Sequence, residues 1–400
     1  MKLFAQIGHG LGDKVTVGLA EKLIDGAIFS PKDLKRDTMV NRLAEVCHDY
    51  PDAEILVDPQ FYVCLFSNSP AINIGNITDW SCFRTFRKGE LERSQTIDSV
   101  LDEYFREIAD LEVTAVIAPN IYISQSFDSR EAVIAKNFVR QTREIYEKRN
   151  NKRPLFASLI ICREALQDRK EFEDFINDIT MLEARPDGFY LIIASRSSEA
   201  TSDIYHTDVV ANWMMLNLSL SINGFQVING YSDILTPFLG AAGGVAGATG
   251  WWSNLRMFSI DRFFPSVGGR LPIIRYLSKL LLNRITVSEK EALIPLVPEV
   301  LNQLQHDEEY DPEHNAEHSP EPERSREVLQ SWEALKSLNG EMSDNDVATG
   351  LKKCFEVISR AEQAYSEIAS FGIVLDRKSR DEHVLPLLDG LRQFKERAEL

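Results

Sequence analysis

Eight short apolar runs alternate with longer amphipathic stretches over residues 1 to 290, and this alternation constrains the fold most strongly. Strands separated by helical segments are typical of repeated β-α units, which build parallel sheets. Eight such units in about 250 residues match a closed (β/α)8 TIM-like barrel of the α/β class. A doubly wound open sheet also shows this alternation, but the strand count favours the barrel. The runs are residues 2–8, 26–30, 53–58, 113–119, 154–161, 188–195, 224–230 and 241–250, of which the last, rich in Gly and Ala, is the weakest.

Two further regions follow the predicted barrel of residues 1–300. Residues 301–327 include HDEEYDPEHNAEHSPEPERSRE, which has nine acidic and two basic side chains and almost no apolar ones. Such a composition cannot offset the entropy of ordering, so we expect an acidic, disordered linker. Residues 328–400 repeat apolar side chains at three- and four-residue spacing and are expected to be helical. These helices are a candidate surface for homo- or hetero-oligomers.

We expect a cytoplasmic protein that needs no metal ion or cofactor and does not associate with a membrane. The five cysteines are scattered without a CxxC pair, which argues against a disulfide framework and a cysteine zinc site. The N-terminal apolar run is too short for a signal peptide. No run reaches the roughly 18 apolar residues of a membrane span.

Polar residues at the carboxyl ends of the predicted strands are the candidates for chemistry, because catalytic groups of such barrels lie there. Asp58 ends the run ILVD and is the candidate catalytic residue, since a carboxylate directly after an apolar strand is costly to desolvate. The alternative is that Asp58 caps the turn before Pro59. The candidate substrate-binding residues are His9, Gln60, Asn120, Arg196, Tyr231 and Asp233. His9 is explained equally well as a turn residue, and Asp233 better as a helix N-cap.

The glycine-rich run LGAAGGVAGATG (239–250) covers the predicted eighth strand. Barrels often hold phosphate groups with the loops after their last two strands, so Gly247 and Thr249 are candidate phosphate-binding residues. Tight packing of a strand against a helix explains the glycines equally well.

Charge is distributed unevenly along the chain. The formal net charge of −17 argues against a polyanionic partner, but removing residues 306–327 leaves −10. Residues 251–284 carry six basic and one acidic side chain, with aromatic residues interleaved. Basic groups contact phosphates and exposed rings stack on bases, so this segment predicts nucleic-acid binding through Arg256, Arg270, Arg275 and Lys279. The alternative is that the rings are core and the arginines are solvated.

The same segment resembles the end of the catalytic barrel of tRNA-guanine transglycosylases and their DNA-modifying deazaguanine relatives. NLRMFSIDRFFPSVGGRLPIIRYLSKLL (254–281) is similar to their Asn-Leu-Arg, Phe-x-Pro and Tyr-x-x-x-Leu pattern. ILVDPQFYV is similar to their strand ending in Asp-Ser-Gly-Gly-Phe-Gln, and PLFASLII with DGFYLIIASR to two later strands. The resemblance implies a glycosyltransferase of the pentosyl-transfer type. It would exchange or remove a purine or 7-deazapurine base in tRNA or DNA.

Three parts of that family's pattern are absent from this sequence. Residues 266–270 stand where the zinc-binding cysteines are expected, and the eighth run offers no nucleophilic carboxylate. Asn120 and Ile160 take the places of the groups that read the base, and Asp58 is the one carboxylate carried over in context. Two other hypotheses therefore remain. One is a non-catalytic barrel that binds nucleic acid or a partner subunit, and the other is an unrelated barrel enzyme that binds a phosphorylated ligand or a flavin.

Overall fold

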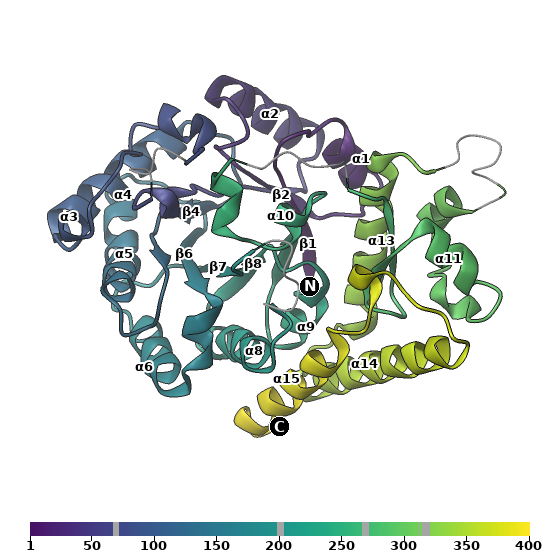
Figure 1. Cartoon of the computed structure of the whole chain (residues 1–400). Coiled ribbons are helices and arrows are strands. Elements are labelled where there is room, and N and C mark those ends of the chain that lie inside the picture. Colours follow the sequence, from purple (N-terminus) through teal and green to yellow (C-terminus); the bar gives the residue numbers. More distant parts are fainter. Residues whose placement is uncertain (67–71, 198–203, 266–271, 312, 314–320) are drawn as a thin grey trace.

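Each of the eight apolar runs contains one strand of a parallel, nearly closed barrel, which confirms the predicted fold class (Figure 1). The structure, a computed structural model, describes residues 1–400 except 67–71, 198–203, 266–271, 312 and 314–320. The strands follow the order β3-β2-β1-β9-β8-β7-β6-β4 around the ring, and the short β5 adds to β6. Their bounds are β1 Lys2–Gln6, β2 Gly26–Phe29, β3 Glu54–Val57, β4 Val116–Ala118, β5 Tyr122–Ile123, β6 Leu155–Cys162, β7 Gly188–Ala194, β8 Gln226–Gly230 and β9 Ala246–Thr249.

The ring closes between β3 and β4 through one threonine that precedes β4. Thr114 N donates to Ile55 O at 2.9 Å. Ile55 N in turn donates to Thr114 Oγ1 at 2.8 Å. The side chain of Thr114 thus replaces a backbone acceptor, which satisfies the backbone groups of β3 where no regular ladder forms.

An Asp-Gly pair sets the register at the start of β2 and again at the start of β7. Asp25 Oδ2 accepts a hydrogen bond from Leu3 N at 2.8 Å, and Asp25 O accepts one from Glu54 N at 3.0 Å. A Cβ on Gly26 would lie 2.1 Å from Glu54 O, so this backbone approach requires glycine. Asp187–Gly188 makes the corresponding contacts with β6 and β8. Each pair therefore ties three neighbouring strands together.

Helices cover the outside of the barrel and bury apolar side chains against the strands (Figure 1). Ser129 and Asp168 cap α5 and α6, each accepting a backbone hydrogen bond at the helix start. The helices up to β9 are α1 Lys14–Ala20, α2 Arg36–Asp49, α3 Lys88–Leu91, α4 Ser94–Ala109, α5 Arg130–Glu147, α6 Arg169–Thr180, α8 Thr207–Ile222 and α9 Thr236–Ala241.

The chain leaves the barrel after β9 and returns to it with a later helix. It first forms α10 (Ser253–Arg256), an antiparallel hairpin of β10 (Arg275–Ser278) and β11 (Asn283–Thr286), and α11 (Val287–Leu293). Helix α13 (Arg324–Met342) then packs against α1, β1 and α9 (Figure 1). The ring of Trp332 lies so close to Gly18 of α1 that a Cβ there would be 2.8 Å from it. Helix α13 thereby takes the position of the barrel's last helix.

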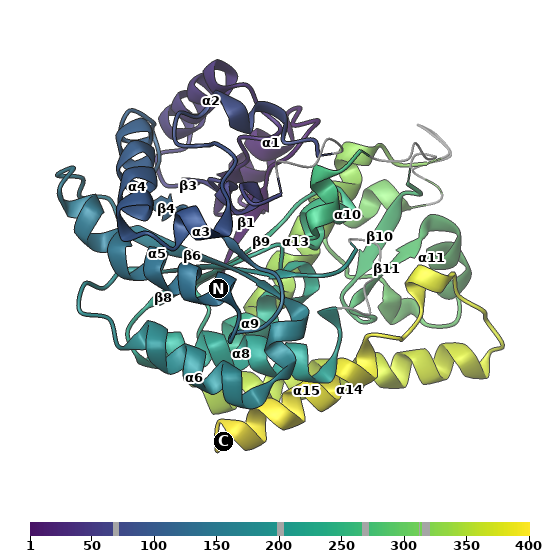
Figure 2. The ribbon, with the colours of Figure 1, turned by 60° about the vertical axis from the view of Figure 1, so that its left-hand side comes forward.

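The last two helices lie on the outside of the barrel's helical layer. Helix α15 (Val384–Arg397) packs along α8, and α14 (Val347–Ser370) packs against α9 and α15 (Figure 2). They bury apolar side chains at the predicted three- and four-residue spacing, among them Leu351, Ile358 and Tyr365. The predicted helical region is therefore helical, but it begins at Arg324 and not at residue 328.

Two local expectations need correction. In the run 241–250 only Ala246–Thr249 is a strand, because Ala241 still belongs to α9. In the predicted disordered linker, Gln305–Tyr310 form a 3-10 helix, and Tyr310 is buried against Tyr276. The order there comes from apolar contacts with a distant hairpin, which composition does not reveal. Residues 312 and 314–320 of the linker lie outside the described residues, and the division into three regions stays a prediction.

The glycine at the start of β2 supports a stability prediction. Gly26→Ala places a methyl group against Glu54 O, and we expect the free energy of unfolding to fall by about 2–3 kcal/mol, as for other overpacked sites. Gly340→Ala in α13 is the matched control. A Cβ there meets nothing within 4 Å, and we expect a gain of roughly 0.5–1 kcal/mol. Urea unfolding measures both, and an unchanged stability of Gly26→Ala contradicts the assigned register.

Candidate active site

Three polar residues meet where the first three strands end. Gln6 is the last residue of β1, while Ser30 and Asp58 directly follow β2 and β3. The register of β2 and β3 pairs Gly26 with Glu54 and Phe29 with Val57. The next residues on the two strands, Ser30 and Asp58, therefore lie side by side. All three are buried. The register at the start of the strands therefore places a hydroxyl and a carboxyl group together at the mouth of the barrel.

Asp58 is held by hydrogen bonds on both of its oxygens. Gln60 N donates to Oδ1 at 3.0 Å, and Tyr62 OH donates to Oδ2 at 3.1 Å. The first bond is the turn cap that the structural alternative predicted, while the second joins Asp58 to a tyrosine cluster. Burial raises the pKa of Asp58 to about 6, although the hydrogen bonds and the charge of Arg262 oppose this rise. Asp58 therefore changes its charge in the range that suits a general acid or base.

Three donors around Asp58 have no hydrogen-bond partner among the described residues. They are Gln6 Nε2, Ser30 Oγ and Gln60 Nε2, and all are buried. The two glutamine oxygens are occupied, because Tyr190 OH donates to Gln6 Oε1 at 3.3 Å and Lys32 N donates to Gln60 Oε1 at 2.9 Å. A buried donor without a partner costs about 1–3 kcal/mol, so three of them at adjacent strand ends need an explanation.

The segment after β9 forms a cover over this cluster. The cover (residues 253–263) comprises α10 and the 3-10 helix Ile260–Phe263. Ser195, which follows β7, forms an isolated parallel β-bridge with Ser259 of the cover. Its backbone N–H donates to Phe258 O at 2.9 Å. The rings of Phe258 and Phe263 contact the ring of Tyr62 edge-on, with centroids 5.3 and 6.0 Å away. Asp58 and its neighbours thus lie beneath an aromatic layer.

Arg262 reaches from the cover down to the ends of two strands. Its guanidinium donates to Tyr231 OH after β8 and, at 2.9 Å, to Asp33 Oδ2 after β2. Burial alone would lower the pKa of Arg262, but Tyr231 and Asp33 outweigh this effect and raise it. Gln60 and Tyr231 both have left-handed backbones, with φ of 52° and 55°. Such strain in residues other than glycine persists where surrounding contacts enforce it and is frequent at functional sites.

Three of the predicted site residues meet in this cluster, and the others do not. Asp58, Gln60 and Tyr231 lie together around the cover's arginine. Gln6 and Ser30 join them from the ends of β1 and β2. Tyr62, Tyr190 and Arg262 complete the cluster and were not predicted from the sequence. No local pattern marks them, because Tyr190 lies within an apolar strand and Arg262 within an aromatic run.

Asn120, His9 and Arg196 lie outside the cluster. Asn120 Nδ2 donates to Ser158 O at 2.8 Å, and its amide is used to hold β4 against β6. His9 is exposed, as the turn interpretation predicted. Arg196 is at the surface, where its Nε donates to Glu164 at 2.8 Å.

Asp233 and Thr249 belong to a second buried group. Arg284 of β11 donates to both oxygens of Asp233, at 2.6 and 2.9 Å, and Thr249 Oγ1 donates at 2.6 Å. Burial alone would raise the pKa of Asp233, but Arg284 outweighs it and holds the pKa low. Asp233 is thus an ion-pair partner and not the predicted N-cap. A Cβ on Gly247 would lie 2.6 Å from Thr236 of α9, which supports the packing interpretation of that glycine.

The basic side chains of residues 251–284 are neutralised within the protein. Acidic groups from the barrel mouth and from the C-terminal region pair with each of them that the structure describes, and most of these arginines are largely buried. Arg270 lies outside the described residues. The local excess of positive charge is therefore accounted for by ion pairs within the chain, which are Arg256–Glu327, Arg262–Asp33, Arg275–Asp376, Lys279–Glu341 and Arg284–Asp233.

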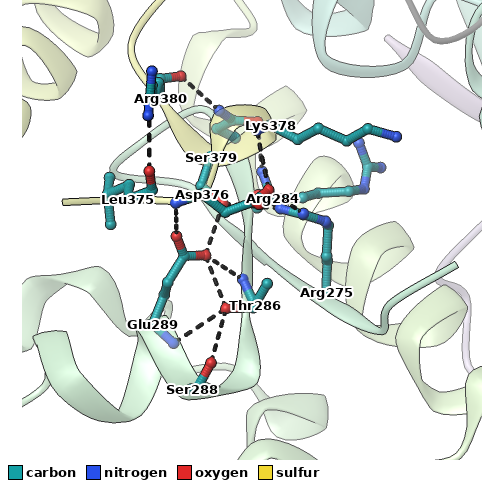
Figure 3. Close-up of polar contacts among 11 residues, drawn as sticks. Arg275, Arg284, Thr286, Ser288, Glu289, Leu375, Asp376, Lys378, Ser379 and Arg380 are labelled. Carbon is teal, nitrogen blue, oxygen red and sulfur yellow. Dashed lines mark hydrogen bonds and ion pairs between the residues drawn. The ribbon is translucent and has the colours of Figure 1, made fainter.

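Figure 3 shows one of these pairs in its setting. Arg275 of β10 donates to Asp376 and, at 2.8 Å, to Ser379 Oγ. Ser379 Oγ donates to Glu289 of α11 at 2.7 Å, and the same carboxylate accepts from Thr286 N in a capping box. Arg275 thus joins the hairpin to the loop before α15, a structural role that replaces the predicted phosphate contact.

The residues that the structure describes show neither a metal-binding cluster nor a membrane-spanning helix. They contain no group of three His, Cys, Asp or Glu side chains placed to hold a metal ion. Among them, no helix has the length and apolar character needed to cross a bilayer.

Comparisons with known proteins identify no family for this chain. No family model and no curated protein matches the chain. Several solved structures match at low identity, among them the following three. The HpcH/HpaI aldolase from Desulfitobacterium hafniense is 12% identical, with 62% of this chain and 86% of the aldolase covered, at a TM-score of 0.34. A family 3 β-N-acetylglucosaminidase from Paenibacillus is 10% identical (96% and 66% covered, TM-score 0.40). Dihydrodipicolinate synthase from Oceanobacillus iheyensis is 8% identical (98% and 96% covered, TM-score 0.22).

The resemblance to tRNA-guanine transglycosylases is wrong. The three structures named above are of other proteins, and no family model matches the chain. The physical reason lies in the segments that suggested it. The aromatic and basic run 254–281 builds the cover and internal ion pairs, and its spacing reflects packing within this chain.

The raised pKa of Asp58 predicts a pH-dependent stability. Asp58 has a pKa of about 6 in the folded protein against 3.8 unfolded, so the folded state binds the proton more tightly. Its contribution to the free energy of unfolding therefore falls as the pH rises from about 4 to about 6, by roughly 3 kcal/mol in total. Asp58→Asn removes this dependence. The free energy of unfolding of both proteins is measured with urea from pH 4 to pH 8. The value for the wild type minus the value for the variant should decrease as the pH rises. A constant difference would contradict the raised pKa of Asp58.

Proposed function

We propose that this chain is a barrel enzyme that moves a proton on a small carbonyl compound, with Asp58 as its general base and acid. The observation that carries the proposal is the set of three buried, unpartnered donors beside a buried carboxyl group. The proposal retains the alternative of an unrelated barrel enzyme. It replaces the phosphorylated ligand or flavin of that alternative with a small oxygen-bearing molecule.

The unpartnered donors support an acceptor atom as the missing partner. Two amide N–H groups and one hydroxyl, from Gln6, Gln60 and Ser30, suit the oxygen of a carbonyl group. Donors aimed at an oxygen on which negative charge develops stabilise the transition state without reorganising. A ligand oxygen at this place would also remove the cost of the three unpaired groups.

The position of Asp58 supports the proton transfer itself. Its carboxylate removes a proton from the carbon next to the carbonyl group, and the bonding electrons move to the carbonyl oxygen. Asp58 then returns a proton to the same carbon or to a neighbouring one. A pKa of about 6 leaves the base ionised at neutral pH while it still holds a proton long enough to return it. The aromatic cover excludes water from the intermediate.

Hydrogen–deuterium exchange of dihydroxyacetone in D2O tests the proposal. We expect the wild-type protein to accelerate exchange of the carbon-bound protons. The exchange is measured as the loss of their proton NMR signal. Asp58→Asn should reduce this rate by roughly 100-fold or more, and the wild-type rate should rise with pH through about 6. Arg196→Gln, at the surface away from the cluster, is the matched control and should keep the wild-type rate.

Two outcomes contradict the proposal. One is exchange at the buffer rate with the wild-type protein. The other is an exchange rate that Asp58→Asn leaves unchanged while the variant remains folded by circular dichroism.

A further inference from the structure

Two cations at the barrel mouth share a single carboxylate. Asp33 Oδ2 accepts from Arg262 at 2.9 Å, and Asp33 Oδ1 lies 3.7 Å from Lys32 Nζ. The side chains of Arg262, Lys32 and Asp33 are 3%, 14% and 11% exposed, so none of the three charges is well solvated. Buried charges are normally paired one to one, and here two cations are in contact with one carboxylate.

The other charged group that faces Arg262 is Asp58. The negative charges of Asp33 and Asp58 both favour the charged form of Arg262. Among the described residues, however, no ion pair or hydrogen bond joins Asp58 to Arg262 or Lys32, and Asp33 is the only carboxylate in contact with either cation. A second carboxylate, supplied by a ligand, would give each cation its own partner.

We infer, building on the proposed function, that Arg262 and Lys32 bind the carboxylate of a 2-oxo acid whose keto oxygen meets the donors of Gln6, Gln60 and Ser30. Guanidinium groups pair with carboxylates through two parallel hydrogen bonds, and the carboxylate replaces Asp33 as the partner of Arg262. The guanidinium is fixed for this role, since its carbon lies 5.5 Å from the ring centroids of both Tyr231 and Phe263.

A carboxylate suits these surroundings better than a phosphate. A phosphate monoester carries about −1.5 to −2 charges at neutral pH and would be repelled more strongly by Asp58 and Asp33. A carboxylate carries one. Arg262 and Lys32 thus determine specificity for a singly charged acid, and Asp33 competes with that acid for Arg262.

Comparison of hydroxypyruvate with dihydroxyacetone tests the inference, because the two differ by one carboxylate in place of a CH2OH group. Binding is measured by ligand-observed NMR with the full-length protein, and exchange in D2O as above. We expect hydroxypyruvate to bind about tenfold or more tightly than dihydroxyacetone. Arg262→Gln should bring this ratio close to one, Arg262→Lys should retain part of it, and Arg196→Gln should leave it unchanged.

Asp33→Asn gives the opposite and more diagnostic result. The substitution keeps Arg262 but removes the competing carboxylate, so hydroxypyruvate should bind several-fold more tightly than to the wild type. Misfolding cannot explain this gain in affinity, because a misfolded variant would bind more weakly.

The outcomes separate the inference from the proposed function. If Asp58-dependent exchange of dihydroxyacetone is seen but hydroxypyruvate binds no better, the inference is wrong and the proposed function stands. Inorganic phosphate that competes at lower concentration than hydroxypyruvate overturns the carboxylate assignment. If neither carbonyl compound binds or exchanges, both proposals fail.

Discussion

The two Asp-Gly pairs at the base of the barrel are the contacts on which the rest of the structure depends. Each aspartate accepts from the strand before it and, through its carbonyl, from the strand after it, while the glycine lets the backbones approach. Asp25 also pairs with Lys336 of α13, so the same residue anchors the barrel's last helix. The register set there carries Ser30 and Asp58 to the same level at the opposite end of the barrel.

Ion pairs between distant segments make the C-terminal region part of the barrel's architecture. The segment after β9 is basic, and its partners include Glu327 of α13 and Asp376 before α15. Pairing of buried charges removes most of the cost of burying them, which allows arginines to occupy positions beneath the cover and behind the hairpin. The excess of positive charge that suggested nucleic-acid binding is neutralised within the protein. The sequence does not reveal this, because the acidic partners lie far away along the chain.

The site residues that could be predicted from the sequence are those that lie at or just after the end of a predicted strand. Asp58 and Gln60 follow an apolar strand, and Tyr231 follows another, so the strand ends placed all three at the mouth. Arg262, Tyr190 and Tyr62 could not be found in this way. Arg262 reaches the site because the cover folds back over the barrel, and Tyr190 because its side chain crosses to Gln6. His9, Asn120 and Arg196 also follow strands but are used elsewhere, since a strand end alone does not determine the direction of a side chain.

The sequence by itself determined the eight strands, their parallel arrangement and the helical character of residues 328–400, because hydrophobic periodicity is a local property. It also marked Asp58 as unusual. Only the tertiary structure decided that α13 completes the ring, that the 305–310 segment is ordered and that the arginines are paired. Each of these depends on which segments far apart in the chain come into contact, and burial and charge pairing between such segments leave no local pattern.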